Sequence, residues 1–262
     1  MRIVVTGAFD DTRSPGVRLL ERAARMGDVT VALWSDGLVE EITGAEPRFP
    51  EEERCYFLEA LRQVAAVTVL EALPAASVGS GPWAVAGGAR GVAARLERAG
   101  MEVLDLGDGG LEPFPPIRPD FTVRPEMRRA VVTGCFDWIH TGHVRFFEEA
   151  SAYGDLYVCL GNDANIESLK GPGHPLFPAE ERAFMVDSVR HVYRAVVSRG
   201  MGWLDAEPEI EWIRPDAYVV NEDGDKPEKR AFCASKGIEY VVLRRLPKPG
   251  LPARQSTDLR GY

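Results

Sequence analysis

Two of the four histidines in this chain stand in one short loop, His140-Thr141-Gly142-His143. The loop follows an apolar segment at 130–132 and precedes a stretch that reads as a helix. A helix N-terminus offers free N–H groups and a partial positive charge to an anion, and Gly142 lets a phosphate approach the backbone closely. Imidazoles on both sides can donate hydrogen bonds to phosphate oxygens, as phosphoryl and nucleotidyl transfer require. The alternative is a turn carrying two surface histidines.

The frame of this loop occurs twice, but only the second copy keeps the histidines. Residues 6–10 read Thr-Gly-Ala-Phe-Asp and residues 133–137 read Thr-Gly-Cys-Phe-Asp. In this register Arg13, Pro15 and Gly16 stand where the second copy has His140, Gly142 and His143. The repeat therefore predicts one working site and one that has lost its chemistry.

The elements that must position the loop alternate between strands and helices in both halves. In the first half we expect strands at 2–6, 29–33, 67–70, 83–87 and 101–106, and helices at 15–26, 51–58 and 90–98. In the second half we expect strands at 129–133, 156–161, 193–197, 217–220 and 239–243, and helices at 142–153, 178–189, 203–213 and 226–236. This alternation predicts an α/β fold, with parallel sheets that are doubly wound by helices.

A stretch rich in proline and glycine separates the two halves. We therefore divide the 262 residues into a domain at 1–106, a linker at 107–127 and a domain at 128–262. Each domain is large enough to bury its own core. The offset between the copies grows along the chain, which predicts that the first copy lacks a segment just before the strand at 83–87.

The composition is that of a globular protein in water, with 45% hydrophobic and 27% charged residues. A net charge of -9 argues against a general nucleic-acid binder. The four cysteines are far apart and form no C-x-x-C pair, so we expect neither a zinc site nor a disulfide framework. The sequence shows neither an apolar leader nor an apolar run of about 18 residues. We therefore expect a cytoplasmic protein that binds no membrane.

The segment 134–143, Gly-Cys-Phe-Asp-x-x-His-x-Gly-His, resembles the signature of the nucleotidyltransferases with the HxGH motif, in particular their cytidylyltransferase-like family. The resemblance covers 128–260 and, more weakly, 1–106, and the tandem plan is similar to that of ethanolamine-phosphate cytidylyltransferases. It implies two Rossmann-like (HUP-type) domains, the first degenerate. It also implies transfer of a nucleotidyl group from a nucleoside triphosphate to a phosphomonoester, with Mg²⁺ present and pyrophosphate released.

This resemblance assigns roles to the residues of the loop and to one lysine. It implies that His140 and His143 are catalytic, and that Gly134, Cys135, Phe136 and Gly142 bind the nucleotide. Lys170-Gly171 resembles the family's Lys-Gly segment, in which the lysine bridges the phosphates of the two substrates. Lys170 is one of 5 lysines against 26 arginines, and we expect its flexible ammonium to follow the migrating charge from a glycine-rich loop.

Further nucleotide contacts are implied near the C-terminus and after the strand at 217–220. The run at 256–260 resembles the family's S-T-x-x-R element, so Ser256, Thr257 and Arg260 are expected to bind the triphosphate. A disordered tail is the alternative. Asn221 lies at the carboxyl edge of the predicted sheet, where α/β folds bind ligands. It is expected to read the base or the acceptor, and an acidic turn is the alternative.

Two more residues are implied to face the acceptor. The resemblance places Asp137 near the acceptor and the metal. Arg182 belongs to a Glu-Arg pair that in the family contacts phosphate or base. However, the first copy keeps Asp10 and Arg54 at the matching positions although it has lost the histidines. Structural roles are therefore the alternative for both residues.

Three functions follow from these observations. The first is a cytidylyltransferase that moves CMP from CTP to an alcohol, polyol or sugar phosphate. The second uses ATP instead, because the segments 170–182 and 213–216 match heptose-phosphate adenylyltransferases at least as well. The third is a nucleotide-binding module without turnover, which is our interpretation of the first copy. We expect that copy to serve as an intramolecular pseudo-dimer partner, with a homodimer as the alternative.

Overall fold

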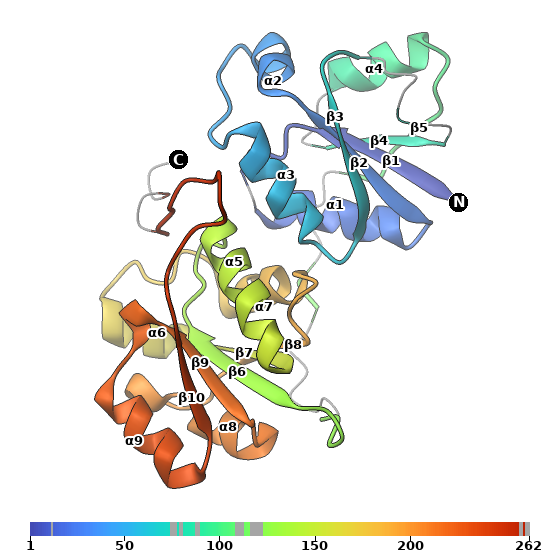
Figure 1. Cartoon of the computed structure of the whole chain (residues 1–262). Helices are drawn as coiled ribbons and strands as arrows, with labels where there is room; N and C mark the ends of the chain where they lie inside the picture. Colours follow the sequence, from blue (N-terminus) through green and yellow to red (C-terminus); the bar gives the residue numbers. More distant parts are fainter. Residues whose placement is uncertain are drawn as a thin grey trace. The chain divides into compact units, whose positions relative to one another are not determined.

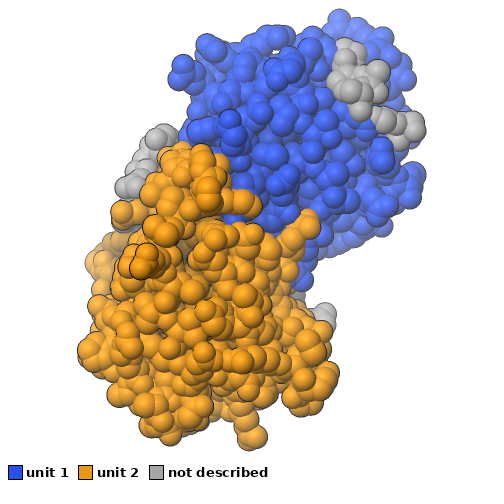
Figure 2. All heavy atoms as spheres, in the orientation of Figure 1, with its two compact units in different colours: residues 1–113 blue, residues 114–262 orange. Residues whose placement is uncertain are grey.

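The computed structural model describes residues 1–11, 13–73, 78, 81–86, 90–107, 113–115, 123–256 and 259. The chain divides into two compact units, residues 1–113 and residues 114–262 (Figure 2). Each unit has its own five-stranded sheet (Figure 1). The boundary between the units falls within the stretch that we expected to be a linker.

The first unit follows the expected alternation, with its strands in the order β3-β2-β1-β4-β5. All pairings between these strands are parallel. Its elements are β1 (Arg2–Gly7), α1 (Ser14–Ala24), β2 (Asp28–Trp34), α2 (Asp36–Thr43), α3 (Glu51–Glu59), β3 (Val64–Leu70), β4 (Trp83–Val85), α4 (Arg90–Arg98) and β5 (Val103–Leu104).

The second unit repeats this plan with strand order β10-β9-β6-β7-β8, again all parallel. Its elements are β6 (Arg129–Gly134), α5 (Thr141–Ala150), β7 (Asp155–Leu160), α6 (Asp163–Lys170), α7 (Ala179–Asp187), β8 (Arg194–Val197), α8 (Glu207–Ile213), β9 (Ala217–Asn221), α9 (Pro227–Lys236) and β10 (Glu239–Leu243). Short 3-10 turns lie at Ser151–Tyr153, Gly202–Leu204 and Glu222–Gly224. Matching strands therefore occupy matching places, and the predicted α/β doubly wound class is confirmed for both halves.

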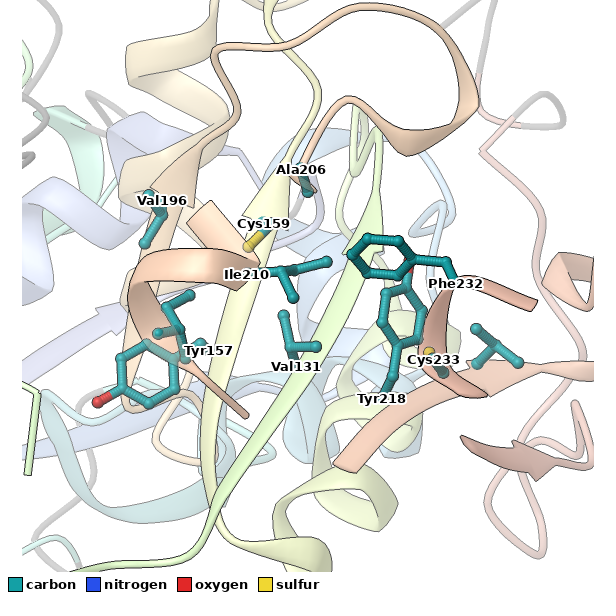
Figure 3. Packing of buried hydrophobic residues seen from close by; sticks show 11 residues of the cluster. Val131, Tyr157, Cys159, Val196, Ala206, Ile210, Tyr218, Phe232 and Cys233 are labelled. Carbon is teal, nitrogen blue, oxygen red and sulfur yellow. The ribbon is translucent and has the colours of Figure 1, made fainter. Parts of the chain in front are cut away.

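The strands of the second sheet are apolar along most of their length because helices cover both faces. On one face, Val131, Tyr157 and Tyr218 pack against Ile210 from α8 and Phe232 from α9 (Figure 3). All five side chains are buried. This core positions the carboxyl ends of β6 and β9, and the predicted site residues lie at these ends and just after them.

Two short helices, α2 and α6, were not among the elements that we expected. Each begins at a capping side chain: Ser35 Oγ accepts the N–H of Leu38 at 3.2 Å, and Asn162 Oδ1 accepts that of Asn165 at 2.9 Å. Such caps supply hydrogen bonds that a short helix cannot make internally. Lys170 is therefore the last residue of α6, and our expectation that it lies in a glycine-rich loop was wrong.

The segment that the first copy lacks can also be located. In the second unit the connection from β8 to β9 contains α8, whereas the connection from β3 to β4 is shorter and shows no such helix in its described residues. Among the described residues, no helix is long and apolar enough to span a bilayer.

Candidate active site

The candidate site lies at the carboxyl edge of the second sheet. There the chain leaves β6 toward β7 on one side and returns to β9 on the other, and such a switch point is where α/β sheets bind ligands. A cavity of about 270 Å³, here called the main cavity, opens at this edge. Its lining includes the predicted residues Gly134, Cys135, Phe136, Asp137, His140, Gly142, His143, Lys170, Asn221 and Ser256. Of the predicted residues that the structure describes, Arg182 is the one that does not line it.

His140 caps the N-terminus of α5 with its own ring. Its Nδ1 accepts the backbone N–H of Gly142 at 3.1 Å, so in the neutral ring the proton resides on Nε2. The side chain is only 1% exposed, and Nε2 has no hydrogen-bond partner within the described part of the chain. The structure thus holds an N–H donor ready for a ligand in the main cavity.

His143 stacks on His140, with ring centroids 3.9 Å apart and 27° between the planes. The ring of Phe136 makes a T-shaped contact with that of His143, with the ring centroids 5.3 Å apart. The Nδ1 of His143 is also buried and without a partner among the described residues. The two imidazoles are therefore held together by stacking, and Phe136 packs against His143.

Both imidazoles are neutral at neutral pH. Burial, assisted by the charges of Arg245 and Arg254, lowers the pKa of His140 to about 3. Burial first, and then His140, Arg245 and Lys170, also hold the pKa of His143 well below its usual value. The pair therefore acts first as a set of hydrogen-bond donors and lone pairs, and an approaching polyphosphate would favour its protonation.

Two glycines make room for this arrangement. A Cβ on Gly142 would lie 2.9 Å from Cε1 of His140, and a Cβ on Gly134 would lie 2.9 Å from the ring of Phe136. Phe136 itself adopts a φ of 48°, a left-handed conformation uncommon for a bulky residue. We expected Gly142 to let a phosphate approach the backbone. The structure adds a second reason for both glycines, because aromatic rings occupy the space that a Cβ would need.

Arg182 holds the loops under the cavity together. It is 1% exposed, and its guanidinium donates to three backbone carbonyls and one carboxylate. The acceptors are Phe177 O at 3.0 Å, Cys135 O at 2.7 Å, Gly161 O at 2.9 Å and Asp163 Oδ1 at 2.7 Å. Asp137 lines the cavity but also binds the loop before α7, accepting the N–H groups of Leu176 and Phe177 at 2.7 and 3.1 Å. These contacts favour the structural alternative for Arg182.

The first unit contains the same frame. Arg54 is fully buried and donates to Phe49 O at 2.9 Å, Ala8 O at 2.7 Å, Trp34 O at 2.8 Å and Asp36 Oδ1 at 2.6 Å. Asp10 accepts the N–H groups of Arg48 and Phe49 at 2.8 and 2.9 Å. Phe9 has a φ of 49°, matching Phe136. This frame persists without the histidines, so it belongs to the fold rather than to the chemistry.

Three cations line the same cavity as the histidine pair. Lys170 reaches the main cavity from the end of α6, Lys229 from the first turn of α9, and Arg245 from the segment after β10. Arg245 forms an ion pair with Asp223. Our reading of the sequence missed Lys229 and Arg245, and it also missed His174, which lines the cavity after α6. The scarcity of lysine, which drew attention to Lys170, could have identified Lys229 as well.

A second opening of about 190 Å³, here called the side hollow, adjoins the main cavity. The two share Gly142, Phe146, Asn221 and Arg245, and the side hollow continues along the segment 244–255. Ser256 follows this segment, and its hydroxyl donates to Trp138 O at 3.2 Å. Thr257 and Arg260 lie outside the described residues, so their expected contacts with the triphosphate remain predictions.

Comparison with known proteins supplies the family. The family model described as "Cytidylyltransferase-like" matches residues 131–233. The FAD synthase of Aciduliprofundum boonei is 37% identical over 138 residues, which cover 52% of this chain and 85% of that protein. The chain belongs to the cytidylyltransferase-like family of nucleotidyltransferases.

Another relative and a solved structure each match a slightly smaller share of this chain. The bifunctional protein HldE of Alcanivorax borkumensis is 35% identical over 130 residues, which cover 46% of this chain and 25% of that protein. The lipopolysaccharide core biosynthesis protein from Thermoplasma volcanium, a solved structure, aligns with 47% of this chain and 98% of its own at a TM-score of 0.39 and 23% identity. The cytidylyltransferase-like match takes in the HxGH loop and ends within α9, so the first unit lies outside it.

Proposed function

We propose that the second unit transfers a nucleotidyl group from a nucleoside triphosphate to a phosphomonoester and releases pyrophosphate. One observation supports this most strongly: a buried, neutral histidine pair with unpartnered ring nitrogens at the N-terminus of α5. Lys170, Lys229 and Arg245 line the same cavity as this pair. Donors and cations in a confined site match the charge of a polyphosphate that reacts there.

In the proposed reaction an oxygen of the acceptor phosphate attacks the α-phosphorus. The bond from that phosphorus to the bridging oxygen of the β-phosphate breaks, and the electron pair leaves with pyrophosphate. The Nε2–H of His140 donates to a phosphate oxygen on which charge grows, and His143 supports the same oxygens from the next position. Lys170 neutralises charge that moves from the acceptor to the leaving group.

Mg²⁺ is implied by the family, and the residues present fit a loosely held ion. The described residues contain no cluster of three or more metal-ligating side chains. Mg²⁺ characteristically binds through substrate phosphates plus one or two carboxylates, and Asp137 and Asp223 are the carboxylates in the lining of the main cavity. Asp137 would hold the ion, because Asp223 is paired with Arg245, and when bound the ion would supply charge neutralisation at the triphosphate.

The proposed donor is ATP or CTP, and different observations support each. FAD consists of a flavin phosphate joined to an adenylyl group, so relatives named FAD synthase, of which the chain covers 76–94%, support ATP and a phosphomonoester acceptor. The description of the matching family supports CTP, our prediction from the sequence. The base would lie in the side hollow, since this opening meets the main cavity beside the histidine loop.

For the first unit we propose a non-catalytic role. Arg13 and Gly16 replace the two histidines, and Thr43 stands at the end of α2 where α6 ends in Lys170. The opening at this edge measures about 1080 Å³ and is lined partly by Arg13, Pro15, Gly16 and Thr43. No imidazole lines the described part of it.

The proposal is tested with the full chain in two steps. Thermal unfolding with Mg²⁺ and each nucleoside triphosphate identifies the donor, because a ligand at about 100 times its Kd adds about 2.7 kcal/mol to stability. Pyrophosphate release is then measured with FMN, glycerol 3-phosphate and phosphoethanolamine. If no triphosphate raises the melting temperature and no pair releases pyrophosphate, the proposal is wrong.

His140→Ala separates an enzyme from a nucleotide sensor. We expect kcat to fall about 100-fold or more, with a much smaller change in nucleotide affinity, because the donor acts on charge that develops in the transition state. Arg13→Ala, the matched position in the first unit, is the control and should leave kcat unchanged. A nucleotide sensor would show the effect of His140→Ala in binding alone.

A further inference from the structure

Lys229 is a buried lysine whose ammonium has no direct ion-pair or hydrogen-bond partner among the described residues. It is 9% exposed and lines the main cavity. Lysine is rarely buried unless it is paired, because its ammonium loses hydration. Within the described part of the chain, no carboxylate lies within 4.0 Å of it and no hydrogen bond involves its ammonium. Its recorded contact is with the face of Tyr218, whose ring centroid is 5.8 Å from Nζ.

Two carboxylates, Asp205 and Asp223, act electrostatically on Lys229, but each has another direct partner. Asp205 accepts the side-chain amide of Asn165 at 3.0 Å, and Asp223 is paired with Arg245. Burial lowers the pKa of Lys229, and Lys226 adds to this, while Asp205 and Asp223 act in the opposite direction. The protein therefore offers partial compensation at a distance but no direct partner.

The first unit shows that the fold does not need a cation at this place. Ile238 N donates to Cys233 O at 2.9 Å, and Met101 N donates to Leu96 O at 3.1 Å, so α9 and α4 end in the same way. In this register Lys229 corresponds to Val92. Val92 is 5% exposed and packs in the apolar core of the first unit. An apolar residue is sufficient for the packing, so the ammonium of Lys229 calls for a functional explanation.

The position of Lys229 indicates which substrate it meets. The main cavity extends from the histidine pair to Lys229, Thr133 and Val220, none of which belongs to the side hollow. The side hollow instead follows the segment 244–255, which leads to the predicted triphosphate-binding residues. Two substrates that meet at the histidines therefore have two separate ways to extend. If the nucleotide occupies the side hollow, the acceptor extends toward Lys229.

We propose that Lys229 binds the acceptor, and that this acceptor carries an oxygen hydrogen-bond acceptor or anionic group besides its reacting phosphate. This inference rests on the proposed nucleotidyl transfer at the same site. An ammonium donates only, so it selects groups such as a carboxylate or a ring carbonyl over a neutral hydroxyl that can be hydrated equally well elsewhere. Lys229 would then decide which phosphomonoester reacts, whereas the histidine pair and Lys170 would act on any.

The test uses the full chain and three probes: FMN with ring carbonyls, 3-phosphoglycerate with a carboxylate, and glycerol 3-phosphate with hydroxyls alone. We expect the wild type to bind FMN or 3-phosphoglycerate more tightly than glycerol 3-phosphate by calorimetry. Lys229→Met should weaken the preferred probe about 10- to 100-fold and leave the binding of ATP and CTP unchanged. With a reacting pair, the same variant should raise KM for the acceptor and not for the nucleotide.

Lys226→Met is the matched control, because Lys226 precedes the first turn of α9 but is exposed and does not line the main cavity. It should bind all probes as the wild type does. The inference is wrong if the wild type does not distinguish the probes, if Lys229→Met binds them equally well, or if it loses nucleotide binding instead. Absence of pyrophosphate release from a wild type that still distinguishes the probes would refute the reaction and not the role of Lys229.

Discussion

The histidine pair is unusual in being both buried and uncharged. Two imidazolium rings at 3.9 Å would repel each other, and Arg245 and Lys170 add to that repulsion. The neutral rings can nevertheless lie among these cations and donate to a phosphate. The cations then attract the polyphosphate, while the imidazoles supply hydrogen bonds at fixed positions.

The low pKa of these rings gives a prediction for solution. The Cε1–H resonance of His140 should not titrate between about pH 8 and pH 5, because its pKa is about 3 in the folded protein and about 6.5 when unfolded. Both histidines stabilise the fold above their unfolded pKa, and this stability is lost as the pH falls toward the folded pKa. Each accounts for at most about 1.4 kcal/mol per pH unit below about 6.5.

The measurement is an NMR titration together with urea denaturation at pH 7 and pH 5. His140→Gln should remove part of the acid-induced loss of stability, because glutamine takes up no proton in this range. A His140 resonance with a midpoint near 6.5 would contradict the burial of the neutral ring.

For single residues, the sequence was most informative where reactive side chains stand close together in the chain. The histidines, Gly142 and the scarce Lys170 were predicted to act together, and the structure gathers them in one cavity. Lys229 and Arg245 were missed because they come from distant segments, and only the paired edges of β6 and β9 bring those segments close. Burial of a lysine also cannot be read from its immediate neighbours in the chain.

Among the elements, the start of α5 decides the geometry of the site. Gly142 occupies the second position of that helix, where alanine would favour the helix but press against the ring of His140. Gly142→Ala should therefore lower kcat about 10-fold or more while the free energy of unfolding changes by less than about 1 kcal/mol. Kinetics and urea denaturation of the same preparation check both parts.

Gly37→Ala is the control for that substitution. Gly37 also holds the second position of a helix, α2, and a Cβ there meets nothing within 4 Å. It should preserve kcat and leave stability equal or slightly higher. Equal kinetics for the two variants would mean that the ring of His140 tolerates displacement.

Strands and long helices were predictable because their apolar residues recur with the period of each element. The helices α2 and α6 were not, since each has only eight residues and depends on a capping side chain. The role of Arg182 was equally hard to predict from the sequence. A Glu-Arg pair at a helix start resembles a substrate contact, and only the carbonyls around its guanidinium reveal a structural role.

On the scale of the whole molecule, two units with separate sheets and cores should respond separately to damage. Arg54→Met and Arg182→Met each leave several buried carbonyls without donors, so each should destabilise its own unit by about 3 kcal/mol or more. Calorimetry of the full chain should then show a lowered transition that differs between the two variants. A single transition lowered equally by both would show that the units unfold as one.

The pseudo-dimer remains a prediction from the repeat. It requires that the second unit depend on the first for its solubility or its activity. A fragment of residues 114–262 that stays monomeric, soluble and as active as the full chain would contradict it. Thermal shifts with nucleotide, measured on both proteins, separate loss of binding from loss of folding.

The duplicated frame also bears on how such a chain can change over time. A phenylalanine in a left-handed conformation, a buried arginine and an aspartate hold the same loop in both units, whatever residues the loop displays. The backbone of this loop therefore keeps its conformation with different side chains at the other positions. A reactive histidine pair can therefore be present in one copy and absent from the other while the loop keeps the same backbone support.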